Sequence, residues 1–473
     1  MVYINGAWRE SNQTIDVINP ATGEVIEAVA SVGQKETKEA IQSAKEAFKS
    51  WKKETGEKRG EYLAKVVELM KERQAELAET ITKENGKPLV DATGEVISGI
   101  KYLEWYAEEA KRVYGDTVPA SHPDKRILVL RQPVGVAAAI TPWNFPFSMI
   151  TRKLAPALAA GCTVVLKPAP ATPLSAIKVF ECFHEAGIPK GVVNLVIGSA
   201  EEIGAEMTSN PDVRKITFTG STAVGKKLLR DSADTVKKVS MELGGHAPLI
   251  VFEDADIEMA VEGVLASKFR NAGQTCISTN RVYVAENIAE EFGKKLAEKV
   301  AHLQVGNGME EGTDVGPLIN KHALEKVETH VQDAVNHGGK VLSGGKVYSN
   351  HEGQGYFYEP TVIQGATESM KIAEEETFGP VAPIFPFKTE EEVIEKANHV
   401  TYGLAGYCFT KDLSRGFRMM EELEYGIVGI NDAAPITVQA PFGGVKESGM
   451  GREGGKYGLD DYLEEKLVSV NTK

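Results

Sequence analysis

The chain has 473 residues, 42% of them hydrophobic and 25% charged, so it is long enough to form two or more globular domains. Its formal net charge of −14 argues against nucleic acid or an anionic membrane as a partner, because both attract basic surfaces. The N-terminus does not resemble a signal peptide and no apolar run is long enough to span a bilayer, so we expect a soluble cytoplasmic protein.

The first part of the chain is predicted to be mainly helical. Asn5-Gly6 between alternating apolar residues predicts a β-hairpin at its start. Apolar residues then recur with helical spacing over residues 37–53, 58–85 and 95–115. Residues 117–131 begin as an irregular segment with two prolines and then read as a strand.

Two regular α/β stretches follow. From residue 129 to 244, short apolar runs alternate with helical segments, which is typical of βαβ units and a parallel sheet. A second alternating set, over residues 247–431, predicts another α/β domain. Residues 460–473 read as a strand after a glycine-rich turn, and we expect this strand to pair with a sheet edge on this chain or another subunit.

The four cysteines have no spacing typical of disulfides or zinc sites, so no metal is expected. Cys162, Cys182 and Cys408 have apolar neighbours, whereas Cys276 ends the run "FRNAGQTC", which predicts a tight exposed loop. A polar, partly open loop with N–H donors lowers the pKa of a thiol and makes it a nucleophile. Cys276 is therefore the candidate nucleophile.

Polar side chains stand at the ends of the predicted strands, where parallel sheets bind ligands. Asn144 in "TPWNFP" is predicted either to cap a helix that begins at Pro146 or to donate a hydrogen bond to an oxyanion. Lys167 in "LKPAP" is either a solvated surface residue or a cation for ribose and phosphate oxygens. Both alternatives stay open on the local sequence.

Two further strand ends carry candidate groups. "FTGSTAVG", residues 218–225, predicts a strand, a turn and a helix N-terminus that offers free N–H groups to a phosphate, although it is not a GxGxxG motif. Glu242 in "MELGG" ends a buried strand, and burial raises the pKa of a carboxylate towards that of a general base. A structural ion pair is the alternative for Glu242. No serine elbow, HExxH or Walker A motif competes.

In this order the motifs "TPWNFP", "KPAPATP", "FTGSTAVG", "MELGGHAP", "NAGQTC", "EETFGPV" and "PFGGVKESGMGREGG" resemble those of the aldehyde dehydrogenase superfamily. The resemblance implies an α/β fold with two parallel-sheet domains and a small β oligomerisation arm. It places a Rossmann-like cofactor domain at residues 1–116 and 131–243, a catalytic domain at 244–440, and the arm at 117–130 and 441–473. It also implies a homodimer or homotetramer.

The resemblance implies a thioester mechanism. Cys276 matches the nucleophile that attacks the aldehyde, and Asn144 together with the Cys276 N–H matches the oxyanion site. Glu242 matches the base that activates water to hydrolyse the thioester, which favours a free carboxylic acid over transfer to coenzyme A. Some members of the superfamily carry a second cysteine two residues after the nucleophile as a redox switch, but this position is Ser278, so no intramolecular disulfide switch is predicted.

The same resemblance implies a nicotinamide cofactor. Lys167 and Glu376 match residues that hold its two riboses, and Phe378 one near the nicotinamide. Pro170 replaces an acid that repels a 2′-phosphate, so NADP is expected, with NAD as an alternative. The predicted cofactor-binding residues are Thr141, Pro142, Trp143, Asn144, Lys167, Pro168, Ala169, Pro170, Gly198, Phe218, Gly220, Ser221, Val224, Leu243, Glu376 and Phe378.

The expected substrate is a small aldehyde that carries a carboxylate. Arg152 and Arg270 match positions that bind the far carboxylate in succinate-semialdehyde dehydrogenases, and Thr437 stands where a serine also contacts it. A surface ion pair for Arg152 and a helix C-terminus for Arg270 are the structural alternatives. Other hypotheses are a glutarate-semialdehyde or other aliphatic aldehyde dehydrogenase, and a non-catalytic structural protein.

Overall fold

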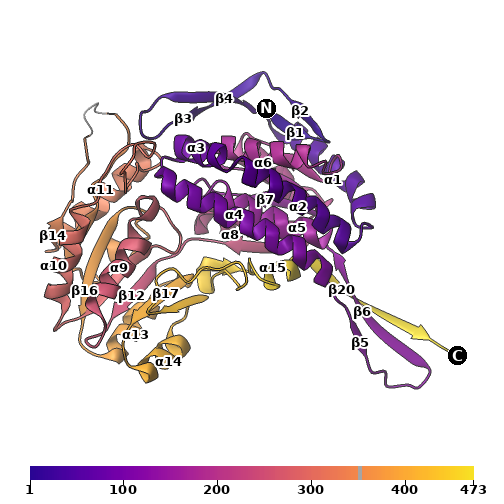
Figure 1. Ribbon diagram of the computed structural model, residues 1–473. Coiled ribbons are helices and arrows are strands. Elements are labelled where there is room, and N and C mark those ends of the chain that lie inside the picture. Colours follow the sequence, from indigo (N-terminus) through magenta and orange to yellow (C-terminus); the bar gives the residue numbers. More distant parts are fainter. Residues whose placement is uncertain (350–353) are drawn as a thin grey trace.

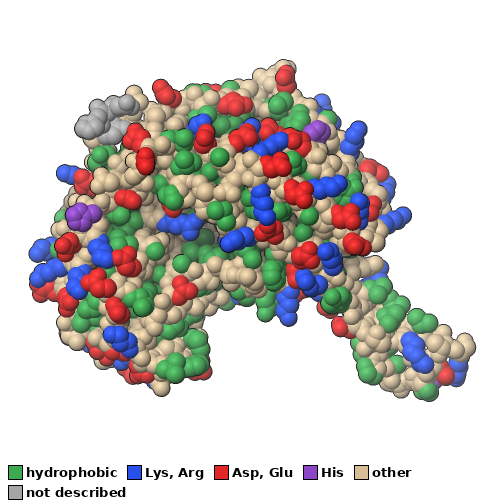
Figure 2. Space-filling view, in the orientation of Figure 1, with side chains coloured by type: hydrophobic (Ala, Val, Ile, Leu, Met, Phe, Trp, Pro, Cys, Tyr) green, Lys and Arg blue, Asp and Glu red, His purple; other side chains and the backbone are tan. Residues whose placement is uncertain are grey.

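The computed structural model describes residues 1–349 and 354–473, which form two α/β lobes and a projecting arm (Figure 1). None of the helices in these ranges is long and apolar enough to cross a membrane. Figure 2 shows acidic and basic side chains interspersed over the face in view, with hydrophobic side chains along the arm.

The first lobe is built on an eight-stranded sheet with the order β19-β11-β10-β7-β8-β9-β1-β2. Its five central strands are parallel, because each connection crosses through a helix. The sheet strands are β1 (Val2–Ile4), β2 (Ala7–Arg9), β7 (Val136–Ile140), β8 (Thr163–Lys167), β9 (Val193–Leu195), β10 (Val213–Thr219), β11 (Lys238–Glu242) and β19 (Gly449–Met450). Strands β1 and β2 form the predicted hairpin, with Asn5 and Gly6 at φ of 55° and 76°.

Helices cover both faces of this sheet. Helices α5 and α6 pack on one face beneath α2, α3 and α4, and α1 and α7 contact the strands from the other side. The bounds are α1 (Gln34–Trp51), α2 (Gly56–Glu72), α3 (Gln74–Asn85), α4 (Leu89–Glu109), η1 (Ala110–Arg112), α5 (Ser148–Ala160), α6 (Pro173–Glu185), α7 (Ala200–Ser209), α8 (Thr222–Ser232), η2 (Ala233–Thr235), η4 (Lys446–Ser448) and α15 (Tyr457–Asp460). Every residue of α5 is buried, including the charged residues Arg152 and Lys153.

The long helix predicted over residues 58–85 is two helices. It breaks at Arg73, whose φ of −102° and ψ of 14° lie outside the helical range. No glycine or proline marks the break in the sequence. The Arg73 guanidinium pairs with Glu185 of α6, and the turn lets α3 pack against α6 and α4.

The second lobe has a seven-stranded sheet with the order β14-β15-β16-β13-β12-β17-β18, parallel except for β14. A separate hairpin, β3 with β4, lies at the edge of the first lobe. The bounds are β3 (Gln13–Ile18), β4 (Val25–Ser31), β12 (Ala247–Val251), α9 (Ile257–Lys268), η3 (Arg270–Gly273), β13 (Thr279–Ala285), α10 (Ala289–Val300), α11 (Lys321–Asn336), β14 (Lys340–Ser343), β15 (Thr361–Gln364), α12 (Lys371–Glu374), β16 (Val381–Phe387), α13 (Glu390–Asn398), β17 (Ala405–Phe409), α14 (Leu413–Glu422) and β18 (Ile427–Ile430).

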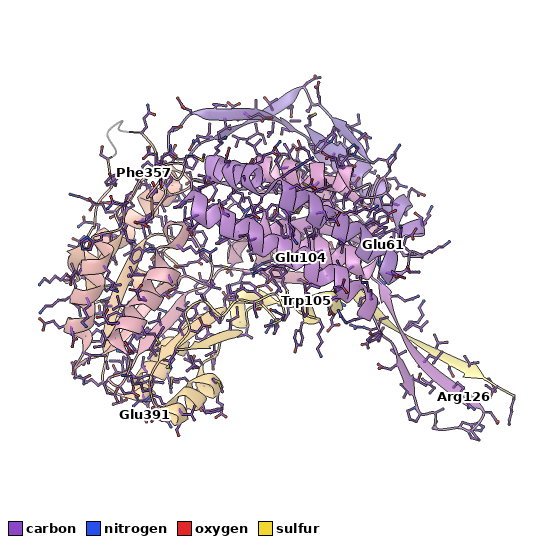
Figure 3. The ribbon with its side chains drawn as sticks, in the orientation of Figure 1. Glu61, Glu104, Trp105, Arg126, Phe357 and Glu391 are labelled. Atoms are coloured by element: carbon purple, nitrogen blue, oxygen red, sulfur yellow. The ribbon has the colours of Figure 1, made fainter. Side chains whose placement is uncertain are left out.

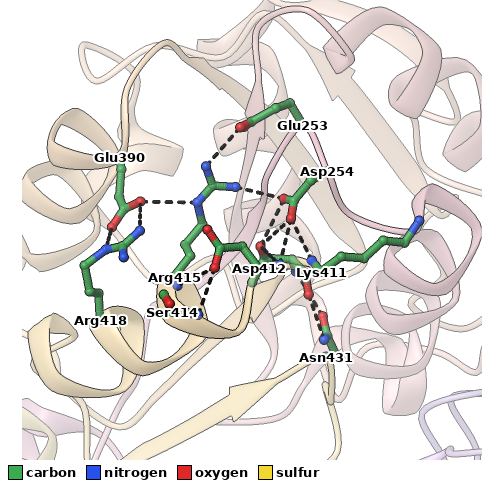
Figure 4. Close-up of polar contacts among 10 residues, drawn as sticks. Glu253, Asp254, Glu390, Lys411, Asp412, Ser414, Arg415, Arg418 and Asn431 are labelled. Carbon is green, nitrogen blue, oxygen red and sulfur yellow. Dashed lines mark hydrogen bonds and ion pairs between the residues drawn. The ribbon is translucent and has the colours of Figure 1, made fainter.

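A charged network fastens the outer helices of this lobe (Figure 4). The Arg415 guanidinium of α14 donates to Glu253 at 2.9 Å, to Asp254 at 2.8 Å and to Glu390 at 3.2 Å. These acids lie after β12 and at the start of α13. One cation therefore joins two helices to the sheet, far from the carboxyl ends of the first sheet.

The arm is a three-stranded antiparallel sheet of β5 (Asp116–Val118), β6 (Lys125–Pro133) and β20 (Leu463–Asn471). The terminal strand pairs with β6 of its own chain, and Arg126 lies far out on the arm (Figure 3). Residues 441–462, predicted to belong to the arm, instead pack on the two lobes: the N–H groups of Val445 and Glu447 donate to Gly403 and Thr401 beside the second lobe, and residues 449–462 lie on the first lobe. Strand β19 pairs with β11, and Leu459 and Tyr462 are buried in that lobe's core, because the glycine-rich turn folds back over the sheet.

Candidate active site

Four strands of the first sheet end on the same side, at Ile140, Lys167, Thr219 and Glu242. The chain runs from β7 outwards to β8 and β9 on one side, and then returns to β10 and β11 on the other. The strand order therefore reverses between β7 and β10. Parallel α/β sheets bind ligands in the crevice at such a point.

The loop that carries Cys276 is folded tightly and is buried from Asn271 to Thr275, so the prediction of an exposed loop is wrong. Asn271, Ala272 and Gly273 adopt φ of 50°, 54° and 73°. Internal hydrogen bonds replace water: the Gln274 amide donates to the carbonyls of Asn271 and Pro317 and accepts from the Ile319 N–H. Cys276 itself is partly exposed.

The thiol of Cys276 lies where two cavities meet. Burial raises its pKa to about 12, and the Glu376 carboxylate acts in the same direction while Arg152 opposes it. The expected lowering of this pKa by a polar loop is therefore wrong. The thiol is protonated at neutral pH, so nucleophilic attack requires that its proton be removed or its surroundings change.

Asn144 does not cap a helix. Helix α5 begins at Ser148, and the carboxylate of Glu95 accepts from the N–H groups of Phe147 and Ser148 at 2.9 and 3.0 Å. The Asn144 amide instead donates to the Gln274 carbonyl at 3.0 Å. The amide group has a second N–H beyond the one that donates to Gln274, and Asn144 lines the cavity of Cys276.

Glu242 ends β11 and is buried. Burial raises its pKa well above that of an ordinary carboxyl, the nearby Glu453 adds to the rise, and Lys153, Arg452 and Arg152 oppose it. Neither carboxylate oxygen has a hydrogen-bond partner among the described residues. The direction agrees with the prediction from sequence, and the unpaired oxygens suit a group that binds water.

The larger cavity, about 350 Å³, lies at the reversal point of the first sheet and is bounded by both lobes. It holds Cys276 at one end, and the aromatic rings of Trp143 and Phe378 meet edge to face with centroids 5.6 Å apart. The predicted cofactor residues that line it are Pro142, Trp143, Asn144, Gly220, Ser221, Leu243, Glu376 and Phe378.

The lining fits a nicotinamide dinucleotide. Ser221 caps α8 through the Val224 N–H, and the remaining N–H groups of the first turn are available to a phosphate. The Glu376 carboxylate accepts from the Gly245 N–H at 3.1 Å, and burial raises its pKa to about 7. An acceptor of this kind can bind ribose hydroxyls.

The other predicted cofactor residues lie behind or beside this cavity. Lys167 donates to the Pro168 carbonyl at 3.0 Å, and burial lowers its pKa to about 8. Gly198 is bridged to Val32, where a Cβ atom would approach the Val32 carbonyl oxygen to 2.0 Å. The residues outside the lining are Thr141, Lys167, Pro168, Ala169, Pro170, Gly198, Phe218 and Val224.

The second cavity, about 260 Å³, opens on the opposite side of Cys276 and contains Arg152 and Arg270. The Arg152 guanidinium is held between the rings of Tyr102 and Phe442, at 4.8 and 4.7 Å. Its Nε and Nη1 atoms are buried without a hydrogen-bond partner among the described residues. Burial of a cation without hydrogen-bond partners raises the free energy of the folded protein, so a bound anion would stabilise this guanidinium.

Arg270 and Thr437 are less suited than Arg152 to binding a substrate carboxylate in this cavity. The side chain of Arg270 is 47% exposed, and its Nε lies 3.8 Å from Asp91. Thr437 is exposed, lies outside the cavity of Arg152 and donates its hydroxyl hydrogen to Gln439. The structure thus does not bring Thr437 together with the two arginines.

Several residues of this region were missed by sequence reasoning. Met149 lines both cavities, and Lys326 of α11 donates to the Glu376 carbonyl. Lys87 and Glu95 form a fully buried ion pair behind Asn144. The sequence contained one indication of the buried ion pair, which was the charged residue Glu95 on the apolar face of a predicted helix.

Comparison with known proteins gives full-length matches. The sequence profile of the aldehyde dehydrogenase family matches residues 8–468. The chain is 53% identical to the glutarate-semialdehyde dehydrogenase of Pseudomonas putida, over 99% of this chain and 97% of the relative. It is 55% identical to the mitochondrial succinate-semialdehyde dehydrogenase of Arabidopsis thaliana, over 99% and 88%. The crystal structure of an NADP-dependent enzyme from E. coli aligns with a TM-score of 0.98 at 51% identity, over 100% and 98%.

Proposed function

Because the chain belongs to the aldehyde dehydrogenase family and is an oxidoreductase acting on aldehydes, we propose that its substrate carries a carboxylate at the far end, with succinate semialdehyde first. The observation that carries the proposal is the buried Arg152 guanidinium with unpaired N–H groups in the same cavity as Cys276. Two relatives are named for different substrates, succinate semialdehyde and glutarate semialdehyde, and both of these aldehydes carry a carboxylate at the far end.

The chemistry follows from the residues around Cys276. After the thiol of Cys276 has lost its proton to solvent water, the thiolate adds to the aldehyde carbon, and the Asn144 amide and the Cys276 N–H hold the resulting oxyanion. Trp143, Glu376 and Phe378 in the larger cavity would hold the nicotinamide cofactor, which would supply the acceptor for the hydride that leaves that carbon. Glu242 then takes a proton from water, which attacks the thioester and releases the carboxylic acid and the free thiol.

The walls of the Arg152 cavity limit the length of the substrate. Ala433, Ala434 and Ile436 are apolar, so they discriminate by shape alone. One methylene more or less changes kcat/KM by roughly 10- to 200-fold in such a pocket. Glutarate semialdehyde is therefore the closest alternative substrate.

For the cofactor we propose NADP, with NAD as the alternative. Pro170 is exposed in the loop after β8 and offers no negative charge against a 2′-phosphate. The E. coli structure at 51% identity is described as NADP-dependent. A homodimer or homotetramer and a cytoplasmic location also stay predictions.

The test compares Arg152→Met with the wild type on succinate semialdehyde, glutarate semialdehyde and butanal, each with NAD and NADP. Loss of charge-assisted hydrogen bonds lowers kcat/KM for both semialdehydes by about 10- to 150-fold, and leaves butanal within about threefold. Arg270→Gln is the matched control at the exposed cation, with a smaller loss expected. Equal losses on butanal and the semialdehydes would contradict the carboxylate assignment.

A further inference from the structure

We propose that the buried ion pair of Lys87 and Glu95 is a positioning device that fixes the Asn144 amide relative to Cys276. The inference rests on the proposed role of Asn144 as the oxyanion donor. Lys87 is not among the residues that line either cavity, and Glu95 belongs only to the wall of the substrate cavity. Both act through the backbone of neighbouring loops.

Lys87 holds Asn144 from behind. Its ammonium donates to the Glu95 carboxylate and to the Asn144 carbonyl, both at 2.7 Å, and lies 3.9 Å from the centre of the Phe145 ring. Both charged side chains are 0% exposed. A buried ion pair contributes little to stability compared with apolar residues of the same size, so its value lies in the geometry that it imposes.

Glu95 fixes the end of the loop that runs from Asn144 to Ser148. One carboxylate oxygen accepts from Lys87, and the other accepts from the N–H groups of Phe147 and Ser148, at 2.9 and 3.0 Å. The pair therefore spans the stretch from the Asn144 carbonyl to the first turn of α5. Rotation of this stretch would break at least one of these charge-assisted hydrogen bonds.

The loop of the nucleophile is attached to the same residue. The Asn271 amide donates to the Asn144 carbonyl at 3.0 Å, and the Asn144 amide donates to the Gln274 carbonyl at 3.0 Å. The backbone and the side chain of Asn144 are thus both bonded to the loop that ends at Cys276. Lys87 completes the set of donors on the Asn144 carbonyl, which fixes the relation between oxyanion donor and thiol.

Asp91 provides a contrast on the same helix. It lies one turn from Glu95, accepts from the Asn271 N–H at 3.2 Å and faces Arg270. It has no hydrogen bond to Asn144. Changes at Asp91 should therefore alter KM for anionic aldehydes, whereas changes at Lys87 should alter the rate of the chemical step for every aldehyde.

The experiment measures the pre-steady-state burst of reduced cofactor in the full-length enzyme. Lys87→Met should slow the burst by about 10- to 100-fold for both succinate semialdehyde and butanal, because a small misplacement of a preorganised donor costs this much. KM for the cofactor should not change. Lys71→Met is the matched control, because Lys71 pairs with Glu104 of the same helix α4 on the exposed outer surface (Figure 3). It should leave the burst at the wild-type rate.

An Asn144→Ala background separates positioning from general damage. A positioning role predicts that Lys87→Met adds no further slowing there, whereas equal slowing in both backgrounds overturns the inference. If Lys87→Met does not fold, Glu95→Gln, which keeps the shape, decides by the same comparison. A wild-type burst in Asn144→Ala overturns the oxyanion role and this inference together. A slow Asn144→Ala with a normal Lys87→Met overturns only the positioning inference.

Discussion

Glu242 is close enough to Cys276 for its charge to help raise the pKa of the thiol, although Glu242 lines neither of the two cavities that Cys276 lines. Both groups act in their deprotonated forms. The thiol must lose a proton to attack, and the carboxylate must be deprotonated to accept one. Burial raises the pKa of both groups, because each charged form loses its hydration. The protein therefore holds both groups in their neutral forms up to a higher pH than in water.

Replacing Glu242 separates the two chemical steps. Glu242→Gln removes the base but keeps the shape, so we expect a normal burst of reduced cofactor followed by a steady rate about 10²- to 10⁴-fold lower. Rapid-mixing absorbance of the reduced nicotinamide measures both phases. A wild-type steady rate in this variant would remove Glu242 from the base role.

The pH dependence of the wild type follows from the same group. Since the folded protein raises the pKa of Glu242, the base becomes protonated at a higher pH than an exposed carboxyl does. The steady rate should fall as the pH falls through this raised pKa, and the burst should not follow the same curve. A steady rate that stays flat down to the range of an ordinary carboxyl, about 4.3, would contradict this.

Among the elements, the segment between α3 and α4 does more than connect two helices. Asn85 donates to the Trp143 carbonyl at 3.1 Å, and Lys87 holds Asn144. Between them Gly86 ends α3 with a φ of 91°, where a side chain would meet Pro317 at 2.5 Å. Three consecutive residues thus link the first lobe, the catalytic loop and the second lobe.

Because Gly86 lies so close to Pro317, a substitution at Gly86 tests how much the packing of this segment contributes to stability. Gly86→Ala should destabilise the protein by about 2–4 kcal/mol, because it combines a left-handed backbone with overpacking against Pro317. The midpoint of urea unfolding measures the effect. The matched control is Gly204→Ala inside α7, where a Cβ atom meets nothing within 4 Å and stability should rise by about 0.5–1 kcal/mol. Equal midpoints for both variants would contradict the packing argument.

At the scale of the whole molecule, the arm is a separate three-stranded sheet, and its terminal strand β20 lies at an edge that pairs with no other described strand. Its terminal strand β20 exposes Leu467 by 69% and Val470 by 43%. Exposed apolar side chains on an unpaired edge strand are a frequent site of association. The arm is therefore where we expect the predicted homodimer or homotetramer to form.

Leu467→Glu tests this expectation. A carboxylate in the apolar contact should shift the enzyme to a smaller assembly, because the buried charge costs more than the contact gains. Light scattering during size-exclusion chromatography measures the mass. Lys466→Glu, on the adjacent position of the same strand, is the control and should keep the wild-type mass. An unchanged assembly in Leu467→Glu would exclude this part of the arm from the interface.

The sequence by itself determined the class of fold and the motifs at the strand ends. Alternating strands and helices predict parallel sheets, and such sheets place their ligands at one edge, so Asn144 and Glu242 were expected at one site. The resemblance of the motifs to the aldehyde dehydrogenases implied that Cys276 belongs to the same site. These conclusions depend on local periodicity and on residue type, and both can be read directly from the amino-acid sequence.

Only the tertiary structure decided what surrounds each group. The break at Arg73, the burial of the loop before Cys276 and the pair of Lys87 with Glu95 all arise from segments far apart in the chain. Burial then reversed the expected pKa shift of Cys276, because the loss of hydration outweighs the nearby donors. Desolvation and long-range contacts depend on packing, which no local sequence pattern reports.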